Sequence, residues 1–197
     1  MEHLIFKSSD SIFGLKVHSS LFEQILTECR SAKRNETGGL MIGRYTPELD
    51  LAIVSKITGP PQDSKAGFSW FYRGVAGLKT LLQKMWETER LHFVGEWHFH
   101  PFSSPAPSST DFNQMKAIAN DSKWQCKEPL LLIVGGDPSG DWKVSVHVCR
   151  ADGSATELVQ TSWPCNKASR LGCCLKTTPL EILYDESLSH RTKKIAM

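Results

Sequence analysis

Three side chains near the middle of the chain have types and spacing that suit a metal ion: His98, His100 and Asp111. Two histidines separated by one residue of an extended strand point to the same side, so their imidazoles can reach one ion. The aspartate follows a short loop that can bring its carboxylate against them. Nitrogen and oxygen ligands suit zinc, and three protein ligands leave a fourth position open, as in catalytic zinc sites. These residues predict one Zn²⁺ per chain.

Each of these residues also has an ordinary alternative. Histidines at such positions can simply be part of a core or a surface. Asp111 stands at the expected start of a helix, where a carboxylate can cap free backbone N–H groups. Ser108 or Ser109 can provide that cap instead, which leaves the Asp111 carboxylate for the metal.

The wider pattern His-x-His-x7-Ser-x2-Asp resembles the motif of the JAB1/MPN/Mov34 metalloprotease family, usually called JAMM. The positions are filled by His98, His100, Ser108 and Asp111. That family also places a glutamate just before a strand, and the segment Glu36–Gly43 is similar to it. The resemblance covers roughly residues 10–150, the scale of one ordinary domain. A lone His-x-His pattern would be weak evidence for this family, whereas all five positions in order are strong evidence.

The resemblance implies roles for two further residues, Glu36 and Ser108. Glu36 would be the general base, which takes a proton from water and returns it to the leaving amine. Glu96 is the rival for that role because it shares a strand face with the histidines, but its position favours a supporting role around the ligands. Ser108 matches a family serine that steadies the attacking water or the oxyanion. Its alternative is a plain helix cap.

JAMM proteins hydrolyse peptide or isopeptide bonds at the C-terminus of ubiquitin or ubiquitin-like proteins. The resemblance therefore implies a deubiquitinase-like zinc metallopeptidase that removes such a modifier from a conjugate or processes its precursor. The form Gly-Glu-Trp-His-x-His-Pro at residues 95–101 is similar to prokaryotic JAB proteins. Those often accompany E1- and E2-like proteins in bacterial operons, including antiphage CBASS operons. By this analogy the partners would be a ubiquitin-like protein, its conjugate and the E1- and E2-like proteins of the operon.

Two other functions remain open. A hydrolase of the same fold could act on a sulfur-carrier adduct or a small peptide adduct. A non-catalytic MPN scaffold typically lacks some ligands, so the complete set here argues against that hypothesis. The His-Glu-x-x-His pattern of other zinc proteases and the Pro-Cys-x-x-Cys pattern of zinc deaminases are missing.

Composition fits one soluble domain of ordinary character. The 197 residues are 40% hydrophobic and 22% charged, and the formal net charge of +2 gives no reason to expect nucleic acid or a membrane as partner. The first residues lack the pattern of a signal peptide, so we expect a cytoplasmic protein. The six cysteines are then expected to be reduced thiols. A second metal site that uses Cys165 with Cys173 or Cys174 is a weaker alternative.

The resemblance implies an α/β fold with a mixed, curved central sheet flanked by helices. We expect residues 1–150 to form the JAMM/MPN domain and residues 151–197 to form a C-terminal extension of unknown role. Hydrophobic periodicity predicts strands over residues 3–17, 38–45, 51–57, 91–98, 129–136 and 142–148. It predicts helices over residues 20–33, 75–89 and 108–120, the first of which would start with a capping box at Ser20–Glu23.

Aromatic residues mark two other features. On the strand over residues 91–98, strict alternation places Phe93 and Trp97 on the face opposite the ligands, and we predict Trp97 and Phe99 to be core residues. The segment Gly59–Arg73 carries a group of aromatics, which we predict to fill a core under the loop, with Trp70 as the exception. The part of that segment over Gly59–Tyr72 and the loop Phe102–Pro107 are candidate walls for an extended substrate tail held by strand addition.

Overall fold

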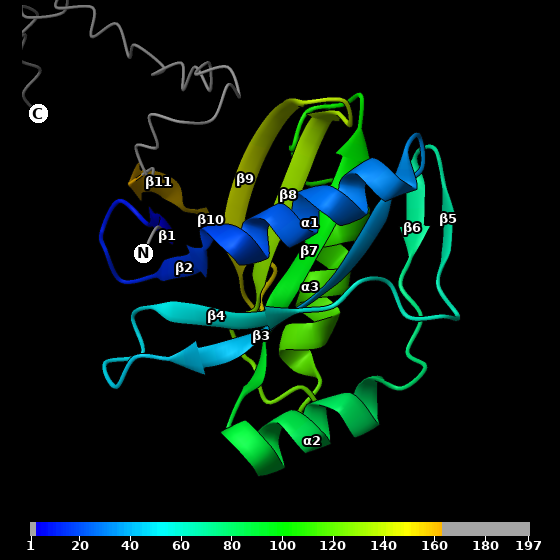
Figure 1. The fold of residues 1–197 in the computed structure, drawn as a ribbon. Coiled ribbons are helices and arrows are strands. Elements are labelled where there is room, and N and C mark those ends of the chain that lie inside the picture. The colour runs from blue at the N-terminus through cyan, green and yellow to red at the C-terminus, as the bar shows by residue number, and fades with distance from the viewer. Residues whose placement is uncertain (1–2, 163–197) are drawn as a thin grey trace, which may run out of the picture.

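A computed structural model of the protein describes residues 3–162 and has a mixed α/β architecture around a strongly curved sheet (Figure 1). The nine strands of this sheet lie in the order β10-β9-β8-β7-β3-β4-β2-β1-β11. These strands are β1 (His3–Lys7), β2 (Gly14–His18), β3 (Thr37–Tyr45), β4 (Ala52–Ile57), β7 (His92–Pro101), β8 (Leu130–Asp137), β9 (Asp141–Cys149), β10 (Ala155–Glu157) and β11 (Val159–Ser162). The helices are α1 (Ser19–Ala32), α2 (Leu78–Glu89) and α3 (Ser109–Asn120). The predicted mixed sheet flanked by helices is confirmed.

A separate hairpin made of β5 (Lys65–Gly67) and β6 (Trp70–Tyr72) stands beside the main sheet (Figure 1). It lies in the connection between β4 and α2. Its two strands pair only with each other, with Ala66 opposite Phe71. This connection was predicted as a loop over a core, and the structure makes it a distinct two-stranded element.

Two hydrophobic cores lie on opposite faces of the sheet. Helix α1 buries Phe22, Ile25 and Leu26 in one of them. Helices α2 and α3 contribute Met85 and Met115 to the other. In each helix the apolar residues recur at helical spacing, so one stripe faces the sheet while the polar positions face solvent.

The N-terminal region differs from its prediction in two details. Residues 3–17 form two antiparallel strands instead of one, because the backbone turns between Ser8 and Phe13. The Ser8 N–H donates to the Phe13 carbonyl at 2.9 Å across this turn. The cap of α1 is His18, whose Nδ1 accepts from the Ser20 backbone N–H at 3.2 Å. The predicted capping box at Ser20–Glu23 is therefore wrong.

Strand β7 contains a β-bulge. Its pairing with β3 shifts by one residue at Val94. Such a bulge inserts an unpaired residue and reverses the faces taken by the side chains on either side of it. Phe93 packs in the α2–α3 core, whereas Val94 and Trp97 pack in the α1 core. The predicted shared face of Phe93 and Trp97 is thus wrong, although Trp97 and Phe99 are fully buried core residues as predicted.

Strands β7 and β8 run parallel, and α3 connects them. A parallel pair needs such a crossover, and here it lays α3 across the face of the sheet (Figure 1). The N-terminus of α3 then follows the end of β7 after the loop over residues 102–108. Residues from both elements meet at this edge of the sheet.

The main sheet includes strands on both sides of residue 150. Strand β10 pairs with β9, and β11 pairs with β1, where Ile5 lies opposite Ser162. The division of the chain at residue 150 stays a prediction. The suggested metal site at Cys165 with Cys173 or Cys174 lies outside the described residues.

Two predictions from composition can be compared with residues 3–162. The three cysteines in this range, Cys29, Cys126 and Cys149, are buried free thiols, as expected of reduced cysteines. Over the same range, the helices are all too short or too polar to cross a lipid bilayer.

Candidate active site

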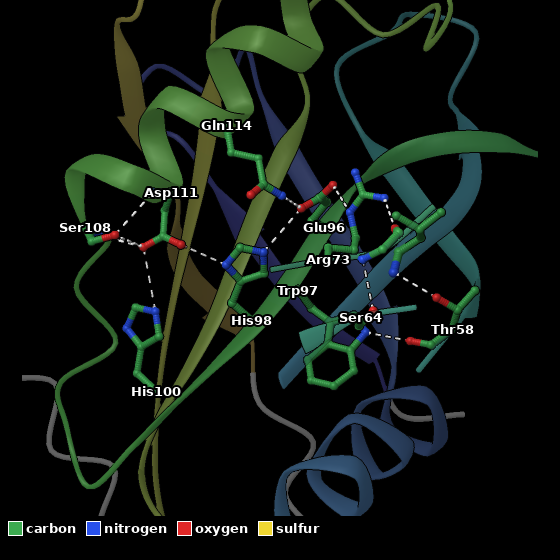
Figure 2. A network of polar contacts seen from close by, with 12 residues as sticks. Thr58, Ser64, Arg73, Glu96, Trp97, His98, His100, Ser108, Asp111 and Gln114 are labelled. Atoms are coloured by element: carbon green, nitrogen blue, oxygen red, sulfur yellow. Dashed lines mark hydrogen bonds and ion pairs between the residues drawn. The ribbon is translucent and has the colours of Figure 1, made fainter. Parts of the chain in front are cut away.

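The two predicted histidine ligands and the predicted aspartate ligand lie together (Figure 2). His98 and His100 come from the end of β7, and Asp111 comes from the first turn of α3. One ligand atom of each residue lies within 4.8 Å of the other two. His98 Nδ1 is 2.8 Å from Asp111 Oδ1, and His100 Nε2 is 3.7 Å from Asp111 Oδ2.

These separations fit a zinc ion. Zinc bonds of about 2.0–2.1 Å in a tetrahedron put two ligand atoms about 3.3 Å apart, so small side-chain shifts would bring three ligand atoms that lie within 4.8 Å of one another onto one ion. All three side chains are nearly enclosed by protein, as expected of polar groups that share a partner. Nitrogen, nitrogen and carboxylate oxygen are donors that zinc prefers. The residues present could therefore hold this metal.

The three groups have pKa values that are shifted by burial and by one another. Burial alone would lower the pKa of His98, but its hydrogen bonds to Asp111 and Glu96 raise that pKa to about 9. Burial acts against the charged form of Asp111 too, yet the bonds from His98 and Ser108 hold its pKa below the usual range. Burial lowers the pKa of His100, which favours its neutral imidazole. Without metal, a proton on His98 faces the Asp111 carboxylate.

The start of α3 fixes the Asp111 carboxylate. Ser108 is the N-cap, and its Oγ accepts from the Asp111 N–H at 3.2 Å. In return Asp111 Oδ2 accepts from the Ser108 N–H at 2.7 Å and from its hydroxyl at 2.6 Å. This reciprocal capping box satisfies free donors of the first turn. Asp111 thus takes part in the cap and also faces the histidines, while a role of Ser108 towards an oxyanion stays a prediction.

A glycine on β3 makes room for the His98 ring. A Cβ atom at Gly38 would lie 2.9 Å from His98 Cδ2 and 2.6 Å from the Trp97 carbonyl oxygen. Both contacts are too close, so only glycine fits beside the ligand at this position. On another side, the Phe71 ring meets the His98 ring edge to face at 5.9 Å between centroids. Phe71 is the aromatic of the hairpin that points towards the site.

Glu36 lies immediately before β3, which pairs with β7 so that Thr37 is opposite Phe99. Its backbone N–H donates to the Gly67 carbonyl of the hairpin at 2.8 Å. The carboxyl is half-buried, and burial together with the Asp111 charge raises its pKa to about 7. A carboxyl with a pKa near neutrality can both take up and release a proton.

Glu96 lies behind His98 and is completely buried. Its Oε2 is 3.2 Å from His98 Nε2 and accepts from Gln114 Nε2 at 2.6 Å. Its Oε1 accepts from Arg73 Nε at 2.8 Å (Figure 2). Sequence reasoning found Glu96 but missed Arg73 and Gln114, because no spacing rule connects residues on separate elements.

The hairpin aromatics are mainly exposed, which corrects the prediction that they form a core. Phe68 is 54% exposed, Trp70 53% and Tyr72 64%. Both faces of a two-stranded hairpin lie outside the main sheet, so alternate side chains reach solvent. The predicted exposure of Trp70 is confirmed. Exposed aromatics next to a buried polar site form a surface that can contact a partner.

Arg34 and two phenylalanines connect the hairpin with the loop after β7. The Arg34 guanidinium lies 6.0 Å from the centre of the Phe68 ring and 5.9 Å from that of Phe102. That loop packs on β8 and β9, where the Ser145 hydroxyl donates to the Pro105 carbonyl at 2.5 Å. Arg34, two residues before Glu36, thus contacts both segments that were predicted as groove walls.

Comparison with known proteins identifies the family. A family model described as prokaryotic homologs of the JAB domain matches residues 18–148. The chain therefore belongs to the prokaryotic JAB family, and the resemblance inferred from its motifs is confirmed. A relative from Enterobacter hormaechei subsp. hoffmannii (strain UCI 50), named CD-NTase/cGAS isopeptidase, is 44% identical over 148 residues, covering 75% of this chain and 82% of that protein.

A solved structure supports the fold. Protein DSY2949 from Desulfitobacterium hafniense matches with a TM-score of 0.51 and 20% identity, over 74% of this chain and 88% of that chain. This likeness concerns the fold alone. The JAB domain and the isopeptidase relative support hydrolase activity for this chain.

Proposed function

We propose that this protein is a zinc-dependent isopeptidase that releases a ubiquitin-like protein from its conjugate. The observation that carries the proposal is the buried group of His98, His100 and Asp111, with the half-buried Glu36 carboxyl, whose pKa is raised to about 7, close to it. The name of the Enterobacter relative suggests that the conjugated target is a CD-NTase or cGAS-like enzyme. We extend that target to this chain because the aligned region, which is 44% identical, covers most of both proteins.

His98, His100 and Asp111 would hold the zinc ion. Zinc bound there supplies Lewis acidity, which activates water and polarises a carbonyl near neutral pH. Glu36 takes the proton from the attacking water and later returns it to the leaving lysine amine, as a carboxyl with a pKa of about 7 can do at neutral pH. The water, the carboxyl and the amine must lie within hydrogen-bond reach of one another for this transfer.

The substrate tail would lie between the β5–β6 hairpin and the loop Phe102–Pro107. The C-terminal tail of a ubiquitin-like protein is an extended peptide, and an extended peptide can add to a strand edge through main-chain hydrogen bonds. The exposed rings of Trp70 and Tyr72 offer apolar area beside such a strand.

The test compares two probes with the protein loaded with zinc. The first is a ubiquitin-like protein joined by an isopeptide bond to a lysine of a CD-NTase, and the second is the same modifier in a linear fusion. We expect cleavage after the modifier's last residue in the first probe, measured by mass spectrometry, and its loss after chelation. Bound zinc without cleavage of either probe would favour a scaffold. Cleavage of a third probe, a short peptide adduct, but of neither of the first two would favour the other hydrolase hypothesis.

A further inference from the structure

The buried contacts behind His98 go beyond the ligand set itself. We propose that Glu96, clamped by Arg73 and Gln114, is a positioning residue that fixes the His98 ring for metal binding. This inference rests on the proposed zinc-dependent function. It gives Glu96 a role different from proton transfer.

Three hydrogen-bond donors surround the Glu96 carboxylate. Arg73 Nε donates to Oε1 at 2.8 Å, and Gln114 Nε2 donates to Oε2 at 2.6 Å. His98 Nε2 lies 3.2 Å from the same Oε2 (Figure 2). A carboxylate can only accept hydrogen bonds, so this ring nitrogen must carry the hydrogen. The other ring nitrogen of His98 then points to Asp111 at 2.8 Å.

This arrangement is what a metal-binding histidine requires. Such histidines commonly donate their second ring N–H to a carboxylate, which fixes the tautomer and the orientation of the ring. Here the carboxylate has partners of its own. The Glu96 side chain cannot move without breaking its bonds to α3, through Gln114, and to the segment after β6, through Arg73.

Arg73 is itself held in one place. Its Nη1 donates to the Gly74 carbonyl at 3.1 Å, and its guanidinium lies 5.1 Å from the centre of the Trp124 ring. The next residue, Gly74, is also held by a hydrogen bond, because its N–H donates to Ser64 Oγ at 3.0 Å. Arg73 follows directly after β6, so the hairpin that would border the substrate is tied to a metal ligand through two residues.

Fold stability alone does not account for an ion pair at this place. The Arg73 and Glu96 side chains are 7% and 0% exposed, and removing two charges from water carries a large desolvation cost. Apolar residues of similar size are often as stabilising as such a pair. The pair Lys56–Glu89, at 2.6 Å with 42% and 44% exposure, is an ordinary surface contact and serves as a control.

The first experiment measures zinc affinity by competition with a chromophoric chelator. Glu96→Gln keeps the shape of the side chain but replaces one carboxylate oxygen by an amide NH2 group. This group would face a hydrogen-bond donor, so one of the three hydrogen bonds from Arg73, His98 and Gln114 must be lost or reversed. We expect zinc affinity to fall by about 10–100-fold, the range typical for such outer partners of metal ligands. Glu89→Gln should bind zinc like the wild type. Unchanged affinity in Glu96→Gln would overturn the proposal.

A double variant separates positioning from stability. Arg73→Met with Glu96→Gln removes both buried charges, so the thermal midpoint of the metal-free protein should recover relative to Glu96→Gln alone. Zinc affinity should nevertheless stay low, because His98 still lacks its charged acceptor. If affinity returned together with the thermal midpoint, Glu96 would be structural only.

A milder variant keeps the proposal testable if the Glu96 variants fail to fold. Gln114→Met leaves the ion pair intact and removes one donor from a partly exposed position. We expect zinc to bind a few-fold more weakly, and unchanged affinity would contradict the clamp. A wild-type protein without zinc affinity would defeat the proposed function itself, whereas normal zinc binding in both the Gln114 and Glu96 variants defeats only this inference.

Discussion

The β7–α3 segment and the β5–β6 hairpin both border the candidate site, but they are built differently. In the first, Glu96, His98 and Asp111 are buried and joined to one another by hydrogen bonds. In the second, Phe68, Trp70 and Tyr72 are more than half exposed. The first can hold a small ion in fixed geometry, while the second offers adaptable surface. This difference separates the chemistry from the recognition of the substrate, and four predictions test the separation.

The largest effect is expected in the β7–α3 segment. Asp111→Ala or His98→Ala should reduce bound zinc from about one per chain to almost none, because two remaining ligands hold zinc poorly. Hydrolysis should disappear with the metal. Elemental analysis of protein purified without a metal-affinity tag measures this. Asp121→Ala, at the other end of α3, is the matched control. Retained stoichiometric zinc in a ligand variant would break the assignment.

Glu36→Gln should lower turnover without changing zinc binding. The amide cannot accept a proton, so turnover should fall by about 10²–10⁴-fold, the usual contribution of general acid–base catalysis. Zinc content and thermal midpoint should change little, because Glu36 is only half-buried and is not one of the three grouped ligands. Glu23→Gln, on the exposed face of α1, is the control. Substantial remaining turnover would transfer the base role to Glu96.

Zinc affinity should depend on pH through His98. The pKa of His98 is raised to about 9 in the metal-free protein, so zinc must displace a proton at any lower pH. We expect affinity to rise about tenfold per pH unit up to about pH 9 and then to level off. Calorimetry in buffers of different ionisation enthalpy should show about one proton released per zinc near pH 7. A pH-independent affinity would contradict the protonated His98.

The smallest effect is expected in the hairpin. Trp70→Ser should raise KM several-fold for the conjugate and leave zinc content unchanged, because the ring is 53% exposed and outside the ligand set. Stability should change by less than about 0.5 kcal/mol, as is usual for surface substitutions. Trp86→Ser removes an equally exposed ring, at 51%, on α2, and should leave KM as it is. Loss of zinc in Trp70→Ser would mean that the Trp70 ring itself helps to hold the ligands.

The ligand group could be predicted because its chemistry is local in the sequence. Strand periodicity places His98 and His100 on one side, and a short loop returns Asp111 at the start of the next helix. Within residues 3–162, most strands and all three helices were likewise predicted, because their apolar residues recur at regular spacing or form continuous runs.

The remaining features depend on contacts that no local pattern carries. Arg73 is separated from Glu96 by 23 residues, and nothing in the sequence between them indicates the ion pair. The bulge at Val94 follows from the fit between β7 and β3, not from the composition of either strand. The hairpin aromatics have the composition of a core, and only the position of the hairpin outside the main sheet leaves them exposed.

The crossover from β7 through α3 to β8 has a consequence for how the protein folds. All three grouped ligands belong to this one β–α–β unit, in which His98 and Asp111 are only 13 residues apart. Contacts that are close in sequence form faster than distant ones, since less chain entropy is lost in closing them. Glu36 and Arg73 lie outside this unit in the sequence. A folding chain is therefore expected to assemble its zinc-binding group before the Arg73 clamp, the proton-transfer residue and the substrate wall are in place.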